Sequence, residues 1–277
     1  MNTAPIRPLT GDEIRRYRDD GIVCLRGLFD AGWLEHLCPL IDRDMAAPGP
    51  LHLELEKDQA AAASGGRFFF DTFLWPRVPG FARFVHESPA AAIAGALMGA
   101  RKVNVFFDQL LVKEPGTTEH TPWHHDLPYW PIDGEQVCTL WLALDEVTAD
   151  SGAVEYLRGS HRWGERYHPP AFAGDDRYRT ALPQVPDFEA RRDELDIVRF
   201  EMQPGDCTVH HGLLVHHAPG NARRDRRRRA YVTRWTGDDV VYAPEGNVMP
   251  VLRDPGIAPG TALDCALWPV VWRAHAG

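Results

Sequence analysis

The sequence has little of several features that mark other classes of protein. No apolar run approaches the roughly 20 residues that a membrane-spanning helix needs, and the N-terminus lacks the apolar stretch of a secretory signal. The five cysteines are odd in number and contain no CxxC pair, which indicates reduced thiols rather than a disulfide framework. We therefore expect a cytoplasmic protein with no membrane partner.

Positive charge is also in deficit, because 30 lysines and arginines stand against 39 acidic residues. The resulting net charge of −9 disfavours nonspecific binding to nucleic acid or to an anionic membrane. The rest of the composition, 44% apolar and 25% charged, is that of an ordinary globular domain. We therefore expect neither nucleic acid nor an anionic membrane among the partners. No pattern in the sequence specifies an oligomeric state.

No internal repeat and no long linker divides the 277 residues, so we expect one domain in three parts. Residues 1–100 are expected to be a helical flanking part. It starts with a helix, a strand and a helix, continues with an exposed loop over 45–66, and ends with a helix over 89–99. Residues 101–240 form the β core, and residues 241–277 are expected to rim a binding pocket.

From residue 102 onward, strand-like runs alternate with glycine, proline and aspartate turns. No interval between them carries a helical crossover, which parallel strands need. The pattern therefore predicts antiparallel strands in a sandwich or barrel, with the N-terminal helices beside it. The expected strands are 102–113, 136–147, 153–157, 196–202, 206–210, 213–217 and 229–236.

Histidine is concentrated in two short stretches of the β core. In the first stretch His124 and Asp126 are two residues apart, so in an extended chain both side chains point to the same side. Two imidazoles and one carboxylate on one face are the ligand set of non-haem Fe(II) oxygenases. That set leaves positions on iron for a cosubstrate and for dioxygen. An HxD pair alone more often forms an ordinary hydrogen bond than a metal site. A metal site with two imidazoles therefore also needs a histidine from the second stretch.

The second stretch leaves the choice of that imidazole open, because His210, His211, His216 and His217 all satisfy the spacing. The arginine run that follows, residues 223–229, reads RRDRRRR and leads into a strand. Most of this run is expected to be a solvated loop. An arginine at the start of the strand that faces the metal would instead hold a dicarboxylate in a bidentate pair, which predicts a 2-oxoglutarate site.

Five segments, in order along the chain, resemble the phytanoyl-CoA dioxygenase family of Fe(II)/2-oxoglutarate-dependent oxygenases. They are QLLVKEPGT, TPWHHDLPYWP, TLWLALDEVTADSGAVEYLRGSHRWG, PGDCTVHHGLLVHHAPGN and RRRRAYVTRW. The N-terminal segment LTGDEIRRYRDDGIVCLRGLF is also similar to the start of family members. The resemblance implies a mainly β fold, a double-stranded β-helix (a cupin-like jelly roll) flanked by α-helices.

The resemblance also implies roles for individual residues. The implied metal ligands are His124, Asp126 and His216. The 2-oxoglutarate arginine falls on Arg228, although a spacing one residue longer than in some members keeps Arg227 and Arg229 as alternatives. The other expected cosubstrate contacts are Trp141, Gln109 and Thr139. The cofactors implied are Fe(II), 2-oxoglutarate as cosubstrate, and O2.

The implied activity is that of a dioxygenase that hydroxylates an unactivated C–H bond of a small molecule or natural-product intermediate, with release of succinate and CO2. The expected substrate contacts are Trp130, Arg234 and Trp235, with the segment 45–80 at the pocket rim. Arg234 lies on the same strand face as Arg228 and is suited to an anionic group. Two alternatives stay open: a zinc-type hydrolase or isomerase with the same ligands, and a non-catalytic cupin-like binding module.

Overall fold

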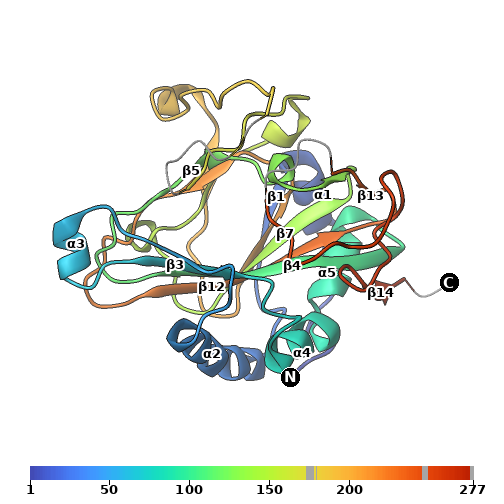
Figure 1. The fold of residues 1–277 in the computed structure, drawn as a ribbon, viewed down its shortest axis with the longest axis horizontal. Coiled ribbons are helices and arrows are strands. Elements are labelled where there is room, and N and C mark those ends of the chain that lie inside the picture. The colour runs from blue at the N-terminus through green and yellow to red at the C-terminus, as the bar shows by residue number, and fades with distance from the viewer. Residues whose placement is uncertain (173–177, 179, 245–248, 275–277) are drawn as a thin grey trace.

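The structure, a computed structural model, describes residues 1–172, 178, 180–244 and 249–274. In this part of the chain a large and a small antiparallel sheet enclose a cavity, and helices cover the outer side of the large sheet (Figure 1). The expected mainly β jelly roll with flanking helices is therefore confirmed. Within the expected pocket rim, residues 245–248 and 275–277 lie outside the described residues.

The large sheet has eight strands in the order β1-β10-β7-β12-β4-β3-β2, with β14 also paired to β4. Their bounds are β1 Ile22–Leu25, β2 Leu53–Leu55, β3 Phe68–Thr72, β4 Lys102–Lys113, β7 Val137–Ala143, β10 Cys207–His211, β12 Arg228–Thr236 and β14 Val270–Arg273. The long strands β4, β7 and β12 lie side by side in its middle. All three are buried along most of their length, and β7 is almost continuously apolar, whereas β4 and β12 also carry buried polar residues such as Asp108 and Thr233.

The small sheet has four strands in the order β5-β11-β8-β9. Their bounds are β5 Thr121–His124, β8 Glu155–Leu157, β9 Ile197–Arg199 and β11 His216–Ala218. A separate two-stranded ribbon joins β6 Ile132–Asp133 to β13 Val241–Tyr242. Each of the seven expected strand runs contains a strand of the structure.

The N-terminal part supplies the helices. Their bounds are α1 Gly11–Asp20, α2 Ala31–Ala46, α3 Gln59–Ala63, α4 Pro79–Glu87 and α5 Ala90–Met98. A capping box of Thr10 and Glu13 starts α1, which satisfies backbone donors that a helix start leaves free. Gly99 ends α5 with a φ of 64°, a left-handed conformation that costs glycine little. No helix in the described ranges is long and apolar enough to cross a bilayer.

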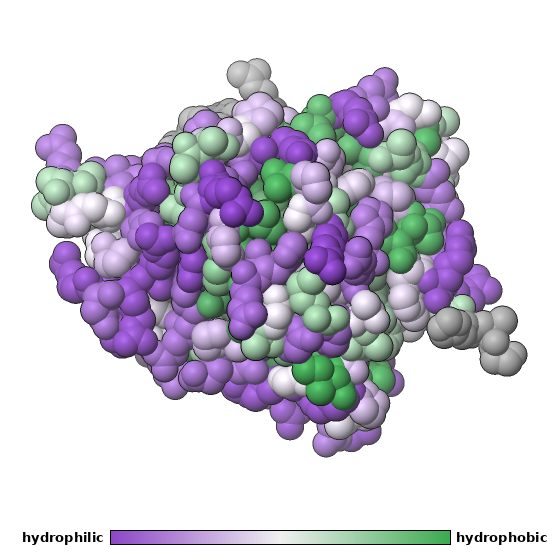
Figure 2. Space-filling model, turned by 90° about the horizontal axis from the view of Figure 1, so that it is seen from below, coloured by the Kyte–Doolittle hydropathy of each residue, from purple (hydrophilic) through white to green (hydrophobic). Residues whose placement is uncertain are grey.

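The main hydrophobic core lies between the large sheet and α2, α4 and α5. Trp33 of α2 and Phe84 of α4 pack edge to face with ring centroids 5.1 Å apart, and Phe84 packs in the same way on Tyr231 of β12. Seen from the helical side, the surface is mostly hydrophilic, with apolar residues in small separate spots (Figure 2). The helices therefore keep the apolar face of the sheet away from water.

Two expectations for the N-terminal part were incomplete. Residues 45–66, expected to be a loop, contain β2 and α3, and the segment that follows supplies β3 and α4. Together β1, β2 and β3 extend the large sheet, so this part contributes strands as well as helices. The short strand β2 has a mixed burial pattern, and its place is fixed by pairing with β3 rather than by a pattern of its own.

Candidate metal centre and its cavity

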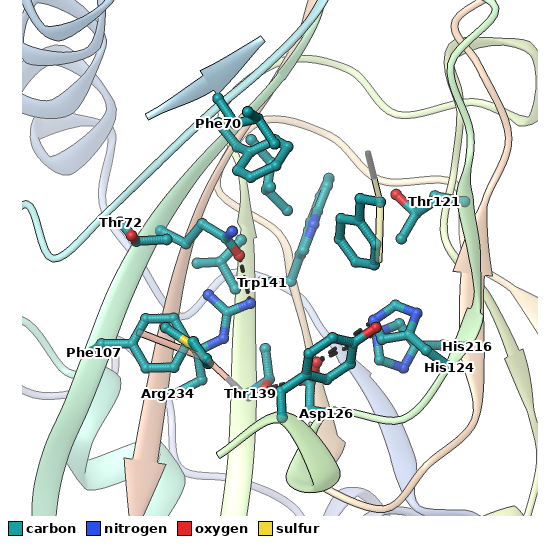
Figure 3. Close-up of a pocket in the computed structure, with 18 of the residues that line it drawn as sticks. Phe70, Thr72, Phe107, Thr121, His124, Asp126, Thr139, Trp141, His216 and Arg234 are labelled. Carbon is teal, nitrogen blue, oxygen red and sulfur yellow. Dashed lines mark hydrogen bonds and ion pairs between the residues drawn. The ribbon is translucent and has the colours of Figure 1, made fainter. Parts of the chain in front are cut away.

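Three side chains, two from the small sheet and one from the loop after β5, converge on one point. His124 is the last residue of β5, His216 is the first residue of β11, and the two are direct partners across the sheet. Asp126 follows β5 at the start of a short 3-10 helix. All three are buried, and each offers a ligand atom within 4.8 Å of the others. Figure 3 shows the three side chains turned toward one another at the cavity wall.

Both imidazoles are held in the orientation that a metal ligand needs. The Nδ1 atom of His124 lies 2.8 Å from the carbonyl oxygen of Pro122, and that of His216 lies 2.9 Å from the carbonyl oxygen of Leu214. A proton on Nδ1 donates to each carbonyl and leaves Nε2 free to bind an ion. Burial, together with His124, lowers the pKa of His216 well below its usual value, so this imidazole is neutral.

The carboxylate of Asp126 presents one oxygen to the two imidazoles and the other to supporting groups. Its Oδ1 lies 3.7 Å from Nε2 of His124 and 3.9 Å from Nε2 of His216. Thr139 of β7 donates a 2.7 Å hydrogen bond to Oδ2. Burial raises the pKa of Asp126, but the surrounding histidines, His124 first, outweigh it and hold that pKa well below its usual value. The group is therefore an anion, as a metal ligand must be.

His210 of β10 is the second support of Asp126, a role that the sequence analysis did not distinguish from that of a metal ligand. Its Nε2 lies 3.3 Å from Oδ2 of Asp126. Its ring is 4.5 Å from the ring of His216, and its Nδ1 has no hydrogen-bond partner among the described residues. The HH pair at 210–211 is the only sequence signal for it. That pair does not show which of its two rings faces the cavity.

The neighbouring histidines are bound elsewhere. His125 accepts a hydrogen bond from the backbone of Tyr167, and burial lowers its pKa to about 4. His211 lies 2.9 Å from the carbonyl oxygen of Glu135. The Nε2 atom of His217 lies 2.7 Å from a carboxylate oxygen of Glu155, so this atom is occupied although the ring also lines the cavity. Each neighbouring histidine therefore has a hydrogen-bond partner outside the set of three ligands.

Neighbouring arginines of the run at residues 223–229 also have different surroundings. Arg227 is partly exposed and pairs with Asp42, and Arg229 forms a two-pronged ion pair with Asp145. Arg228 between them is 1% exposed and points into the cavity. Its guanidinium donates to the carbonyl oxygen of Gly152 at 3.1 Å. No carboxylate in the described ranges pairs with Arg228.

The cavity has a volume of about 360 Å³ and is lined by both sheets. Of the expected site residues, Gln109, Trp130, Thr139, Trp141 and Arg234 all line it. The ring of Trp141 lies 5.2 Å below the guanidinium of Arg228. Burial lowers the pKa of Arg228 to about 10, because no solvent stabilises its charge. The site thus holds a buried cation suited to an anionic ligand. Parts of both expected rim segments reach the wall, at residues 50–53 and 249–250.

The expectation that Trp235 contacts the substrate is wrong. Its side chain is fully buried in the core between the large sheet and the helices, and its Nε1 donates to Thr233. Successive residues of a strand point to opposite faces, so the inward direction of Arg234 sends Trp235 outward. Of the other aromatics, Phe70 lines the cavity, whereas Phe73 packs in a neighbouring cluster.

Comparison with known proteins agrees with this geometry. Residues 17–230 match the model of the phytanoyl-CoA dioxygenase (PhyH) family. A probable phytanoyl-CoA dioxygenase of Caenorhabditis elegans is 26% identical over 52% of this chain and 46% of its own length. The phytanoyl-CoA dioxygenase of Arabidopsis thaliana is 28% identical over 55% of this chain and 51% of its own length. The matches therefore span about half the length of these curated relatives.

A solved structure gives the same fold over nearly the whole chain. It is that of the epimerase SnoN in complex with Fe3+, alpha ketoglutarate and nogalamycin RO. The TM-score is 0.74 at 22% identity, and the match covers 94% of this chain and 98% of that one. At this identity the likeness establishes the jelly-roll fold, and the residues of the cavity have to carry the argument about chemistry.

Proposed function

The chain belongs to the phytanoyl-CoA dioxygenase family, and we propose that it is an Fe(II)- and 2-oxoglutarate-dependent oxygenase that hydroxylates a C–H bond of a small molecule. The observation that carries the proposal is the convergence of His124, Asp126 and His216 in one cavity with a buried arginine. That donor set, two imidazoles and one carboxylate on one side, fits Fe(II) and leaves room for a chelating cosubstrate.

In this proposal the three ligands hold iron, and Arg228 binds the distal carboxylate of 2-oxoglutarate. Iron, when bound, supplies the redox chemistry that couples decarboxylation of 2-oxoglutarate by O2 to oxidation of the substrate, with release of succinate and CO2. The buried guanidinium lies between Trp141 and the carbonyl of Gly152. Its fixed orientation favours a planar bidentate pair.

The remaining residues of the cavity orient the ligands and exclude water. Thr139 and His210 hold one oxygen of Asp126, so the other oxygen stays directed at the ion. Phe107, Trp130 and Phe172 form apolar walls around the centre. Such walls protect a reactive site from solvent and bind the apolar part of a substrate.

The zinc-type hydrolase and the non-catalytic binding module stay as alternatives, and one experiment separates all three. Metal-free protein is loaded anaerobically with Fe(II) and titrated with 2-oxoglutarate, and the charge-transfer band of the complex is recorded. Oxygen is then admitted and succinate is measured. We expect the band and a slow, oxygen-dependent release of succinate even without the true substrate. Both should be absent with Zn(II), which has no redox chemistry.

Two results of the same experiment would contradict the proposal. Turnover of any substrate with Zn(II) and without oxygen consumption would establish the hydrolase alternative. Binding of neither metal nor 2-oxoglutarate would leave a non-catalytic module. Asp126→Ala is the matched control, because it removes the anionic ligand and should abolish both the band and the succinate.

The proposed substrate is a natural-product intermediate. SnoN, whose fold this chain shares, has been solved with nogalamycin RO alongside its metal and cosubstrate. The cavity supports a substrate of this kind because aromatic and aliphatic side chains make up much of its wall. Those residues are Leu51, Leu53, Phe68, Phe70, Phe107, Tyr129, Trp130 and Phe172.

A further inference from the structure

A second buried arginine lies in the cavity without a role in holding iron or the distal carboxylate. The side chain of Arg234, on β12, is 7% exposed and points into the cavity from the wall opposite His124 and His216 (Figure 3). Its Nη2 donates a 2.7 Å hydrogen bond to Gln109. Its Nε and Nη1 atoms are buried and have no hydrogen-bond partner among the described residues.

An arrangement of this kind is costly unless a ligand completes it. A buried donor without a partner lowers the stability of the folded protein, and it does so more strongly when it is charged. The ring of Phe107, 4.5 Å from the guanidinium carbon, offers only a cation–π contact. Burial lowers the pKa of Arg234 to about 10, so the group is still a cation near neutral pH. Nε and Nη1 lie on different edges of the guanidinium, but each shares its edge with Nη2, which has a second hydrogen besides the one donated to Gln109. One edge of the planar cation can therefore still hold the two oxygens of a carboxylate.

The charges of the cavity indicate that one anionic group is missing. Among the described residues that line the cavity, those with a fixed charge are Asp126, Arg228 and Arg234. Together they give the cavity wall a net charge of +1. Fe(II) adds two positive charges and 2-oxoglutarate adds two negative ones, so the net charge stays at +1. A substrate with one carboxylate would neutralise it.

The position of Arg234 separates it from the proposed cosubstrate arginine. Six residues along β12 separate their Cα atoms by about 20 Å, and their guanidinium groups contact different walls, Trp141 and Phe107. In the sheet Arg234 is directly opposite Thr139, which binds Asp126. Along the direction of the strands, Arg234 therefore lies at the same position as the metal centre.

We propose that Arg234, held by Gln109, binds the carboxylate of an otherwise apolar, ring-containing substrate and thereby sets which carbon faces the metal. The inference rests on the proposed function and names the substrate class for the same site. The aromatic walls around Phe107 and Trp130 accept the rings. Because Arg234 lies at the same position along the strands as the metal centre, the oxidised carbon is only a few bonds from the carboxylate.

The test compares acids with their neutral amides. The probes are 2-naphthoate and 2-naphthamide, indole-3-acetate and its amide, and cinnamate and its amide. Each is titrated into the anaerobic Fe(II)–2-oxoglutarate protein while tryptophan fluorescence is followed, because Trp130 lines the cavity. We expect at least one acid to bind about 10- to 100-fold more tightly than its amide, the range for a hydrogen bond to a charged group.

Arg234→Met should remove this preference while leaving the midpoint for 2-oxoglutarate unchanged, and Arg234→Gln serves if the methionine variant does not fold. Arg226→Met is the matched control. It removes one positive charge from an exposed arginine that pairs with Glu146, and it should keep the preference for the acid.

Three results would overturn the inference. One is that no acid binds more tightly than its amide. Another is that the preference survives in Arg234→Met. The third is that Arg234→Met weakens 2-oxoglutarate binding as much as Arg228→Met does, which would make Arg234 a cosubstrate residue. Failure of wild-type protein to bind 2-oxoglutarate with Fe(II) would instead refute the proposed function, and the first titration detects it separately.

Discussion

The two faces of strand β12 contrast in how completely their polar groups are satisfied. On the cavity face Arg228 and Arg234 are buried cations with no carboxylate partner in the described residues. On the opposite face Tyr231 donates a 2.6 Å hydrogen bond to Asp108, and Trp235 donates to Thr233. Arg228, Val232 and Arg234 thus line the site, whereas Tyr231 and Trp235 belong to the core between the sheet and the helices.

This contrast has a thermodynamic meaning. Burying a charge without a partner costs free energy, so the cavity face lowers the stability of the ligand-free protein. The opposite face offsets that cost with aromatic packing between β12 and the helices, where Phe81 and Phe84 contact Tyr231. Mutations on the two faces should therefore affect different measurements. The cavity face should control ligand binding, and the helix-facing side should control the free energy of unfolding.

The largest effect on the cavity side is expected from the metal ligands. His124→Ala, Asp126→Ala or His216→Ala should each abolish retention of Fe(II) and formation of succinate, because each removes one of three protein ligands. Metal content after gel filtration and succinate after exposure to oxygen are the measurements.

The neighbouring histidines provide the control for that experiment. His125→Ala, His211→Ala and His217→Ala should retain iron, because these rings bond to Tyr167, Glu135 and Glu155 instead. Iron lost from His217→Ala but kept by His216→Ala would place the ligand one residue further along β11.

On the helix-facing side, Trp235→Ala should lower the free energy of unfolding by about 3–5 kcal/mol, because it leaves a large cavity in a packed core. Urea unfolding measures this loss. At low urea, where the variant is still folded, the midpoint for 2-oxoglutarate should match that of wild type. A shifted midpoint without a loss of stability would contradict the separation of the two faces.

Arg228→Lys should weaken 2-oxoglutarate binding about 10- to 100-fold, because lysine cannot form the bidentate pair. Titration of the anaerobic charge-transfer band measures the change. Arg227→Lys is the matched control, because Arg227 is partly exposed and pairs with Asp42, and its midpoint should equal that of wild type. A shift in Arg227→Lys alone would move the cosubstrate site by one residue.

Thr139→Val tests the support of the metal ligand and should have the smallest effect. The change keeps the shape of the side chain but removes the 2.7 Å hydrogen bond to Asp126. Loss of such a supporting bond typically weakens metal binding at least tenfold, so Fe(II) affinity should fall by about that factor. Competition with a chelator measures it. An unchanged affinity would show that His210 alone holds Asp126.

Local patterns predicted much of the fold. Alternation of strand and turn residues indicated each of the seven strand runs in the β core, because those strands are long or bounded by strong turn signals. Several short elements were not predicted, namely the strands β2, β3, β5, β6, β13 and β14 and the helices α3 and α4. Their register and packing depend on partners far away in the sequence, and short elements carry little propensity of their own.

For the site, the sequence by itself determined only the two-residue spacing of His124 and Asp126, which places both side chains on one side if the chain is extended. It limited the third ligand and the cosubstrate arginine to short runs, and family resemblance favoured one residue in each. Only the tertiary structure decided which residues enter the cavity. Pairing across the small sheet places His216 opposite His124. The position of β12 between β7 and β4 turns Arg228 and Arg234 inward and Trp235 outward. A strand pattern fixes alternation but not which of its two faces meets the cavity, and that choice is made by contacts between strands distant in sequence.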